Sequence, residues 1–352
     1  MYEYKGCIHV HSVYSDGTGT PSEIIDAANQ ADIDYLILTD HHVLLKEWEG
    51  WYDKVLVCAG EEIGYGTSHY LGFDLKKKVP SYRNSPKKHI ENVKKQGGFG
   101  FLAHPCCVSK PFFFLHYMGW EDWSAGDFNG VELWTYMHDW ITHTHYFNLL
   151  SRMLSPHKGI KGPGKEMLEK YDRITRSRKV PAIGGIDAHA RILNKKWNLL
   201  RYPKYLTLFK NFRNHIITKR KFNQDFNRDS QILYRAMKKG NSFIAHDKLQ
   251  DSSGFRFLGS NKLKKSYYLM GDDLTLTKNT HLTIKSPVKA SIKLIKNGEL
   301  ILCSENEKVE FEINEPGVYR VEVFLARNPW IFTNPIYVNG NSNIKSINPT
   351  SY

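Results

Sequence analysis

The hydrophobic pattern of the chain alternates between short, almost continuously apolar runs and longer amphipathic stretches. The apolar runs lie at residues 7–10, 35–39, 55–60, 99–103 and 181–186. Near-continuous apolar strands are typical of parallel sheets that are buried on both faces. Helix-length stretches separate most of these runs, so the pattern predicts a β/α barrel.

A helix start follows the first apolar run. Thr20 suits the N-cap, Pro21 suits the first helical position, and Glu23 completes a capping box with Thr20. Ile24 and Ile25 open the apolar face of this helix. The first run and this helix therefore form one βα unit of the predicted barrel.

Beyond about residue 252 the pattern changes to short runs in which polar and apolar residues alternate. The clearest runs lie at 281–284, 290–295, 308–313 and 318–324. Such alternation, with turn residues at regular intervals, is typical of an antiparallel β-sandwich. We therefore expect a barrel at residues 1–250, a β-sandwich at 251–340 and a polar tail at 341–352.

Residues that can bind a metal stand at the end of every apolar run in the predicted barrel. His9 and His11 share one face of the first strand, although an isolated His-x-His is more often a solvent-facing pair. The other runs lead into Asp40-His41-His42, Glu61-Glu62, His104-Pro105 and Asp187-Ala188-His189. Functional groups of β/α barrels lie at the carboxyl ends of the strands. Sixteen histidines scattered by chance would not choose strand ends five times, so the pattern predicts a multinuclear metal site.

These motifs, in this order, resemble those of the polymerase and histidinol phosphatase (PHP) superfamily of metal-dependent phosphoesterases. The motifs are His9-x-His11, Ser15-Asp16-Gly17, Thr39-Asp40-His41-His42, Gly60-x-Glu62, Ala103-His104-Pro105 and Asp187-Ala188-His189. The resemblance spans about residues 1–247 and implies a distorted, TIM-like (β/α)7 barrel. Residues 316–337 resemble the carboxyl-terminal domain of the carbaryl-hydrolase-like branch.

The resemblance also implies a trinuclear centre of two to three divalent transition metals, namely manganese, iron or zinc. The first metal would be held by His9, His11, Glu62 and Asp187, the second by Asp16, His41 and His189, and the third by Glu62 as a bridge, His69 and His104. Glu61 is adjacent to Glu62 and stays open as the bridging residue.

Three further residues are candidates for a catalytic role. Asp40 and His42 each flank a ligand, where a side chain can orient that ligand or transfer a proton. Arg191 lies two residues beyond His189, and its guanidinium could pair with a phosphate, although a lone arginine is more often structural. His138 is assigned to no metal, and His246 is expected in an exposed turn.

The aromatic segment at residues 106–126 predicts either a lid that stacks a base or an aromatic leaving group, or a loop packed across the barrel mouth. The net charge of +13 favours an anionic partner, either a small phosphate ester or a nucleic-acid end. The lysine tracts at 76–78 and 219–221 are equally explained as solvated loops.

The expected location is the cytoplasm, because no apolar run reaches the length of a membrane span and the amino terminus enters a strand at once. Five cysteines without a Cys-x-x-Cys spacing predict reduced thiols.

The leading functional hypothesis is hydrolysis of a phosphoester by a hydroxide that the metals generate. The same hydroxide could attack a carbonyl, so a carboxylic ester or carbamate hydrolase is the alternative. A non-catalytic binding module is a second alternative. The complete set of motifs argues against it, because drift would have broken at least one position.

Overall fold

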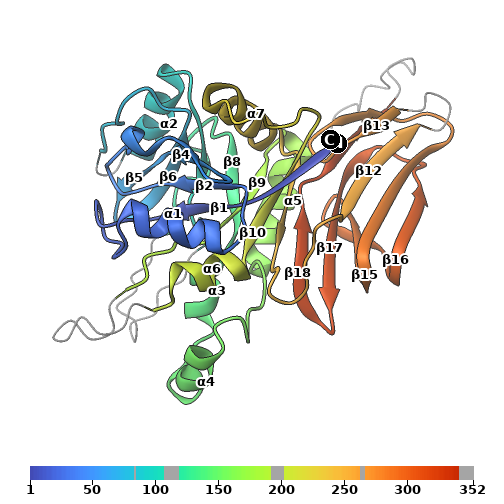
Figure 1. Ribbon diagram of the computed structural model, residues 1–352. Coiled ribbons are helices and arrows are strands. Elements are labelled where there is room, and N and C mark those ends of the chain that lie inside the picture. The colour runs from blue at the N-terminus through green and yellow to red at the C-terminus, as the bar shows by residue number, and fades with distance from the viewer. Residues whose placement is uncertain (83–84, 107–118, 192–201, 262–265, 341–352) are drawn as a thin grey trace.

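The computed structural model describes residues 1–82, 85–106, 119–191, 202–261 and 266–340 (Figure 1). The first part of the chain is a mixed α/β unit, and the last part consists of strands, most of them antiparallel, beside it. The strands of the first unit are β1 (Tyr2–Val10), β2 (Tyr35–Leu38), β3 (Gly50–Tyr52), β4 (Val55–Ala59), β5 (Glu61–Tyr65), β6 (Thr67–Phe73), β7 (Phe99–Leu102), β8 (Gly130–Thr135), β9 (Ala182–Gly185), β10 (Arg213–Thr218) and β11 (Ser242–Ala245).

Helices lie around these strands. They are α1 (Pro21–Gln30), α2 (Pro86–Lys95), α3 (Tyr136–Thr142), α4 (Leu149–Leu154), α5 (Lys165–Ser177), α6 (Tyr205–Asn211) and α7 (Phe226–Lys239), with 3-10 turns at Lys46–Trp48 and Tyr146–Asn148. The predicted capping box of α1 is present: Thr20 Oγ1 accepts the Glu23 N–H, and Glu23 Oε2 accepts the Thr20 N–H. None of the described helices is both long and apolar enough to span a lipid bilayer.

The described strands form two sheets rather than one closed barrel. In the first unit one sheet runs β11-β10-β1-β2-β4-β3, and the other runs β5-β6-β7-β8-β9. Pairing is parallel within β1-β2-β4 and β7-β8-β9, but β5, β6, β10 and β11 pair antiparallel with their neighbours. The mixed α/β fold is confirmed, and the closed (β/α)7 barrel is not. A continuous apolar run indicates that a strand is buried on both faces. Antiparallel strands in a covered sheet are buried in the same way as parallel ones, so the runs do not distinguish the two.

The two sheets meet at two seams. At one seam Val10 forms an isolated parallel bridge with Ala188, and at the other His41 forms one with Glu62. The carboxyl ends of β1, β2 and β9 and the start of β5 lie at these seams. The residues predicted to bind metal are therefore gathered where the sheets approach each other.

The second unit consists of β12 (Arg256–Asn261), β13 (Ser266–Tyr268), β14 (Asp273–Thr275), β15 (Thr280–Lys296), β16 (Glu299–Glu312), β17 (Gly317–Leu325), β18 (Asn328–Thr333) and β19 (Ile336–Asn339). Most of its ladders are antiparallel, and β14 pairs with β19 in parallel. Because β18 pairs with β11, its sheet continues into the first unit, and a separate β-sandwich is not confirmed. The boundary at residue 250 stays a prediction.

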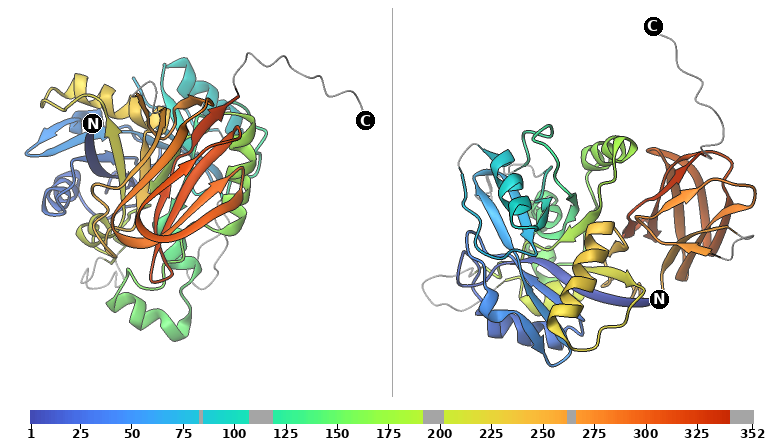
Figure 2. Two further views of the ribbon diagram at one scale, coloured as in Figure 1. Left: turned by 90° about the vertical axis from the view of Figure 1, so that its right-hand side faces the viewer. Right: turned by 90° about the horizontal axis from the view of Figure 1, so that it is seen from above.

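Buried polar side chains also join the two units, which lie side by side in Figure 2. Asn334 accepts the Ala182 N–H at 2.6 Å and donates to the Ala182 carbonyl at 2.9 Å. The Arg320 guanidinium binds both carboxylate oxygens of Asp172 on α5, at 2.6 and 2.8 Å. Bidentate pairs of this kind fix orientation as well as distance.

Two sequence predictions fall partly outside the described residues. Residues 107–118 hold most of the predicted aromatic segment and are among those not described, whereas Trp120 is buried and donates its indole N–H to the Asp122 carbonyl. The prediction of reduced cysteines is the second: Cys7, Cys58, Cys106 and Cys303 take part in no disulfide among the described residues, and Cys107 lies outside them.

Candidate metal centre

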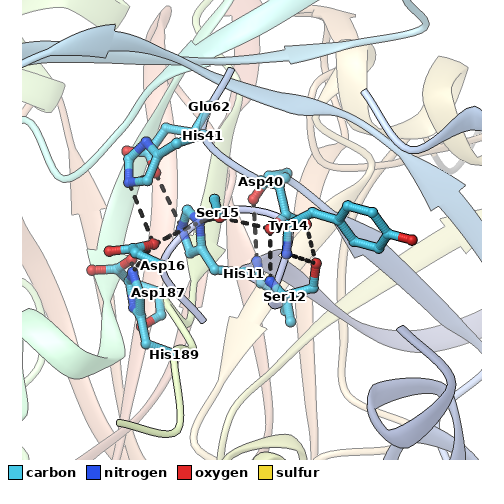
Figure 3. Close-up of polar contacts among 12 residues, drawn as sticks. His11, Ser12, Tyr14, Ser15, Asp16, Asp40, His41, Glu62, Asp187 and His189 are labelled. Carbon is cyan, nitrogen blue, oxygen red and sulfur yellow. Dashed lines mark hydrogen bonds and ion pairs between the residues drawn. The ribbon is translucent and has the colours of Figure 1, made fainter. Parts of the chain in front are cut away.

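The structure brings all nine residues that the sequence predicts as metal ligands into one cluster at the strand ends. Six of them are labelled in Figure 3, namely His11, Asp16, His41, Glu62, Asp187 and His189. His9 and His11 come from the end of β1, His41 follows β2, and Glu62 and His69 lie in β5 and β6. His104 follows β7, and the turn after β9 carries Asp187 and His189.

Glu62 lies at the centre of the cluster and is almost completely buried. Its two oxygens face two sets of imidazoles. Oε2 lies 3.0, 3.1 and 3.5 Å from the Nε2 atoms of His9, His11 and His41. Oε1 lies 2.7 Å from His69 Nδ1 and 3.0 Å from His104 Nε2. One carboxylate thus connects five imidazoles.

Asp187 and Asp16 supply the other carboxylates. Asp187 Oδ1 lies 3.4 Å from Nε2 of both His9 and His11. Asp16 Oδ1 lies 3.0 Å from His189 Nε2. The turn that presents Asp16 is held by Asp40, whose carboxylate accepts hydrogen bonds from the Ser12 N–H, the Ser12 hydroxyl and the Ser15 hydroxyl (Figure 3).

The donor atoms fit divalent metals. Three sets have ligand atoms that all lie within 4.8 Å of one another: His9, His11, Glu62 and Asp187; His11, Asp16, His41 and His189; and His41, Glu62 and His69. The first set is the one that the sequence resemblance implies. The second adds His11 to the implied set, and the third contains His41 where the resemblance implies His104. Imidazole nitrogens and carboxylate oxygens converging on one point are the donors that zinc, manganese and iron prefer.

Electrostatics within the cluster keep the carboxylates ionised. Burial opposes ionisation of Glu62, but His41, His9 and His69 together hold its pKa well below the ordinary value. Burial likewise opposes ionisation of Asp187, and His189 and His9 hold its pKa well below the ordinary value. Burial lowers the pKa of His41 to about 4. A neutral imidazole has a free lone pair, so His41 is in the protonation state that metal binding requires.

The backbone of the cluster is strained. His9, His104 and Asp187 have positive φ angles of 67°, 30° and 59°, which residues other than glycine rarely adopt. Conformations of this kind cost about 1 to 3 kcal/mol each and concentrate at functional sites.

Glu61, the alternative bridge in the sequence, faces away from the cluster. Its Oε2 accepts the Val79 N–H at 2.8 Å, and burial raises the pKa of Glu61 to about 7. Successive side chains of a strand point to opposite faces. Glu62 is therefore the residue that the geometry offers to the metals.

Two residues outside the nine predicted ligands also contact the cluster. Glu132 on β8 lies 2.6 Å from His9 Nδ1 and accepts the His104 N–H at 2.6 Å. A Cβ at Gly185 would lie 1.7 Å from a Glu132 oxygen, so only glycine leaves room for this carboxylate. The Gly130-x-Glu132 strand pattern of the sequence carries no signal for contact with His9.

His138 is the second of these residues. Its Nε2 lies 2.9 Å from Asp187 Oδ2, and its ring stacks on His104 with the centroids 4.6 Å apart. The first turn of α3 directly follows β8 and places His138 there.

The other catalytic candidates lie around the cluster. Asp40 contacts the Ser12–Ser15 turn, as described above. The His42 ring packs against Tyr65, with the centroids 4.2 Å apart. Arg191 is largely exposed, and its Nη2 lies 3.5 Å from Asp16 Oδ2. The catalytic roles of Asp40, His42 and Arg191 stay predictions.

The expectation for His246 is wrong. Its side chain is 1% exposed rather than in an exposed turn, and its ring lies edge-on to Trp134 and Tyr136. The residue follows β11, whose pairing with β18 covers it, and the sequence of the first unit alone gives no sign of that pairing.

Comparison with known proteins agrees with this geometry. The family model described as PHP domain matches residues 8–222, more than half of the chain. An uncharacterised protein of Methanocaldococcus jannaschii is 28% identical over 117 residues, which cover 29% of this chain and 67% of that protein.

Two solved structures are similar at low identity. One is a two-domain protein from Bacteroides vulgatus containing a predicted PHP-like metal-dependent phosphoesterase; it is 15% identical, with 95% of each chain covered and a TM-score of 0.46. The other is an amidohydrolase from Chromobacterium violaceum with bound sulfate; it is 16% identical, covers 52% of this chain and 87% of its own, and has a TM-score of 0.32. The match to the family model over residues 8–222 decides the assignment: the chain belongs to the PHP domain family, and this membership together with the carboxylate and histidine clusters supports a metal-dependent hydrolase.

Proposed function

We propose that the protein hydrolyses phosphoesters at the metal centre built around Glu62. The observation that carries the proposal is the convergence of five imidazoles on the two oxygens of one buried carboxylate. Such a carboxylate can bridge two metals. Bound divalent metals would lower the pKa of a shared water and neutralise phosphate oxygens, which is the chemistry that phosphoester hydrolysis needs.

The residues of the chain have separate tasks in this proposal. His9, His11, Glu62 and Asp187 would hold one metal, Asp16, His41 and His189 a second, and Glu62, His69 and His104 a third. Manganese, iron and zinc all suit these donors. Asp40 holds the turn that carries Asp16, and Arg191 stands beside Asp16, where its guanidinium would meet a phosphate oxygen.

Glu132 orients the His9 ring. His9 Nδ1 faces the Glu132 carboxylate at 2.6 Å, so it would keep its proton there when a metal binds Nε2, the nitrogen that lies 3.0 Å from Glu62 Oε2 and 3.4 Å from Asp187 Oδ1. Carboxylates that orient a metal-binding imidazole in this way typically contribute about 10- to 100-fold to metal affinity or activity.

Replacing Glu132 tests that task. Glu132→Gln keeps the shape of the side chain but removes its charge, so we expect metal affinity to fall by about 10- to 100-fold. Competition with a metal-binding dye measures the affinity. Glu91→Gln, at an exposed position of α2, is the matched control and should bind metal like the wild type. Equal affinity in all three proteins would contradict the assignment.

A comparison of substrates tests the function itself. The purified protein should contain more than one transition metal per chain by elemental analysis. It should hydrolyse phosphate esters faster than carboxylic esters of the same alcohols, lose this activity to a chelator and regain it with manganese. The reverse preference would favour the carboxylic ester or carbamate alternative, for which the apolar cavity described below is also suited. The nucleic-acid end as a substrate and the cytoplasmic location stay predictions.

A further inference from the structure

A cavity of about 330 Å³ opens directly beside the cluster. One wall is the cluster itself, including Asp16, Glu62 and Asp187. The opposite wall is apolar and comes from α3, α4 and the segment before α6; it includes Met137, Trp140, Ile141, Leu149, Met153 and Tyr202. Helices α3 and α4 lie in the lower part of Figure 1, away from the second unit. A molecule held at the metal centre would therefore extend along a hydrocarbon surface.

The cavity offers little to a second anionic group. Among the described residues that line it, Arg191 is the one arginine or lysine, and its guanidinium already lies 3.5 Å from Asp16. Proteins that track a nucleic-acid backbone place several cations along it. Apart from Arg191, the lysines and arginines that give the chain its positive net charge are therefore not among the described residues that line this cavity.

The apolar wall is held firmly in place. Arg152 of α4 is buried and donates from Nη2 to the Trp140 carbonyl at 3.0 Å, which ties α4 to α3. The Tyr202 hydroxyl lies 2.9 Å from the Met153 carbonyl and donates to this end of α4. Side chains on helices that are fixed in this way form a preorganised binding surface.

Helix α4 carries apolar residues on two faces, and the two faces differ in exposure. Leu149 and Met153, four residues apart, are partly buried and line the cavity. Leu150 and Leu154, also four residues apart, are exposed at 72% and 78%. Residues four apart lie on the same face of a helix, so each pair forms one continuous strip. The helix itself therefore offers a matched control for each cavity residue.

We propose that this cavity binds the apolar alcohol part of the substrate, so that the enzyme acts on phosphate monoesters of alkyl or aryl alcohols. The inference rests on the proposed function. In the reaction, the oxygen of water bonds to phosphorus and the bond from phosphorus to the ester oxygen breaks. The ester oxygen leaves with a proton from that water, giving the free alcohol and hydrogen phosphate. The alcohol remains against Leu149, Met153 and Trp140 until it is released.

Two phosphate monoesters of equal chain length test the proposal: hexyl phosphate, and an analogue in which two methylenes of the chain are replaced by ether oxygens. We expect kcat/KM of the wild type to favour hexyl phosphate by about 15-fold, because each of the two buried methylenes contributes about fourfold. Met153→Gln and Leu149→Asn keep the side-chain size but make the wall polar, so each should lower this ratio by about tenfold. The change in this preference from wild type to variant does not depend on the intrinsic reactivity of the two esters, because that reactivity is the same for every variant.

The controls are Leu154→Gln and Leu150→Asn on the exposed face of α4, which should leave the ratio unchanged. An unchanged ratio in both cavity variants, or a wild type that prefers the ether, would overturn the proposal. Calorimetry with hexylphosphonate, which cannot be hydrolysed, separates binding from turnover: it should bind about tenfold more weakly to Met153→Gln than to Leu154→Gln. Equal binding refutes the apolar site. Weaker binding without hydrolysis of either phosphate supports the site and refutes the phosphoesterase function.

Discussion

Replacing Glu62 by glutamine should abolish turnover, with a fall of at least about 1000-fold, the upper end of the cost of removing one electrostatic group from an active site. The substitution preserves the shape of the side chain but removes the charge that lies within 3.5 Å of five imidazole nitrogens, three of them facing Oε2 and two facing Oε1. Two proposed metal positions share this charge, so both should lose affinity. Elemental analysis and initial rates, measured on the same preparation, report the two effects together.

Two neighbouring variants make the Glu62 experiment specific. His104 contacts Glu62 through Oε1 alone, so His104→Ala should weaken the third proposed metal and leave a residual rate from the remaining pair. Glu61→Gln should stay close to wild type, because Glu61 accepts the Val79 N–H outside the cluster. Loss of all metals in His104→Ala, or near-normal activity in Glu62→Gln, would show that Glu62 is not the bridge.

The position of the cluster could be predicted from the sequence because its residues stand next to buried strands. A strand end is visible as the point where an apolar run stops, and His9, His41, His104 and Asp187 all stand at or near such points. The ends of neighbouring strands lie together at one edge of a sheet. No knowledge of the closure or order of the sheets is required for that inference, which is why it holds although the barrel is not closed.

Glu132 and His138 could not be assigned in the same way. Glu132 lies within β8 rather than after it, and its contact with His9 depends on the packing of β8 across from β1. His138 reaches Asp187 because α3 begins immediately after β8. Both contacts are set by side-chain direction and by the approach of distant segments. Hydrophobic periodicity carries no information on either.

The contact between the two units also could not be predicted from the sequence. The alternation after residue 252 predicts antiparallel strands, but pairing between β18 and β11 is a choice of partner over a long separation in the chain. The same limit applies to a buried ionic cluster within the first unit. Glu3, His215 and Asp247 come from β1, β10 and the segment after β11, and nothing in their local sequences connects them.

The ionic cluster of Glu3, His215 and Asp247 should contribute strongly to the free energy of unfolding. His215 is fully buried, with Nε2 2.9 Å from Asp247 Oδ2 and Nδ1 2.8 Å from Glu3 Oε1. Asp247 also accepts the Ser252 hydroxyl at 2.6 Å. Burial lowers the pKa of His215, but Asp247 and Glu3 outweigh it and raise that pKa to about 9. The imidazole is therefore charged at neutral pH, and removal of a partner leaves a buried charge poorly compensated.

Asp247→Asn should lower the free energy of unfolding by about 3 to 5 kcal/mol near pH 6, the usual cost of breaking a buried ion pair from one side. Urea unfolding of wild type and variant measures the difference. Asp251→Asn is the control, since Asp251 is exposed and caps only the Ser253 N–H. That variant should differ from wild type by less than about 1 kcal/mol.

The difference should depend on pH in a defined direction. The pKa of His215 is raised from about 6.5 in the unfolded chain, so its contribution is complete below about pH 6.5 and disappears as the pH rises through about 9. The pKa of Asp247 is lowered despite its burial, mainly by His215, so its contribution disappears in acid, below about pH 4. The gap between wild type and Asp247→Asn should therefore be widest between about pH 4 and 6.5 and clearly smaller at pH 9.5. A gap of equal size at pH 6 and 9.5 would mean that His215 carries no charge in the folded protein, and the stabilising partner of Asp247 would then be Arg213, whose Nη1 lies 3.4 Å away.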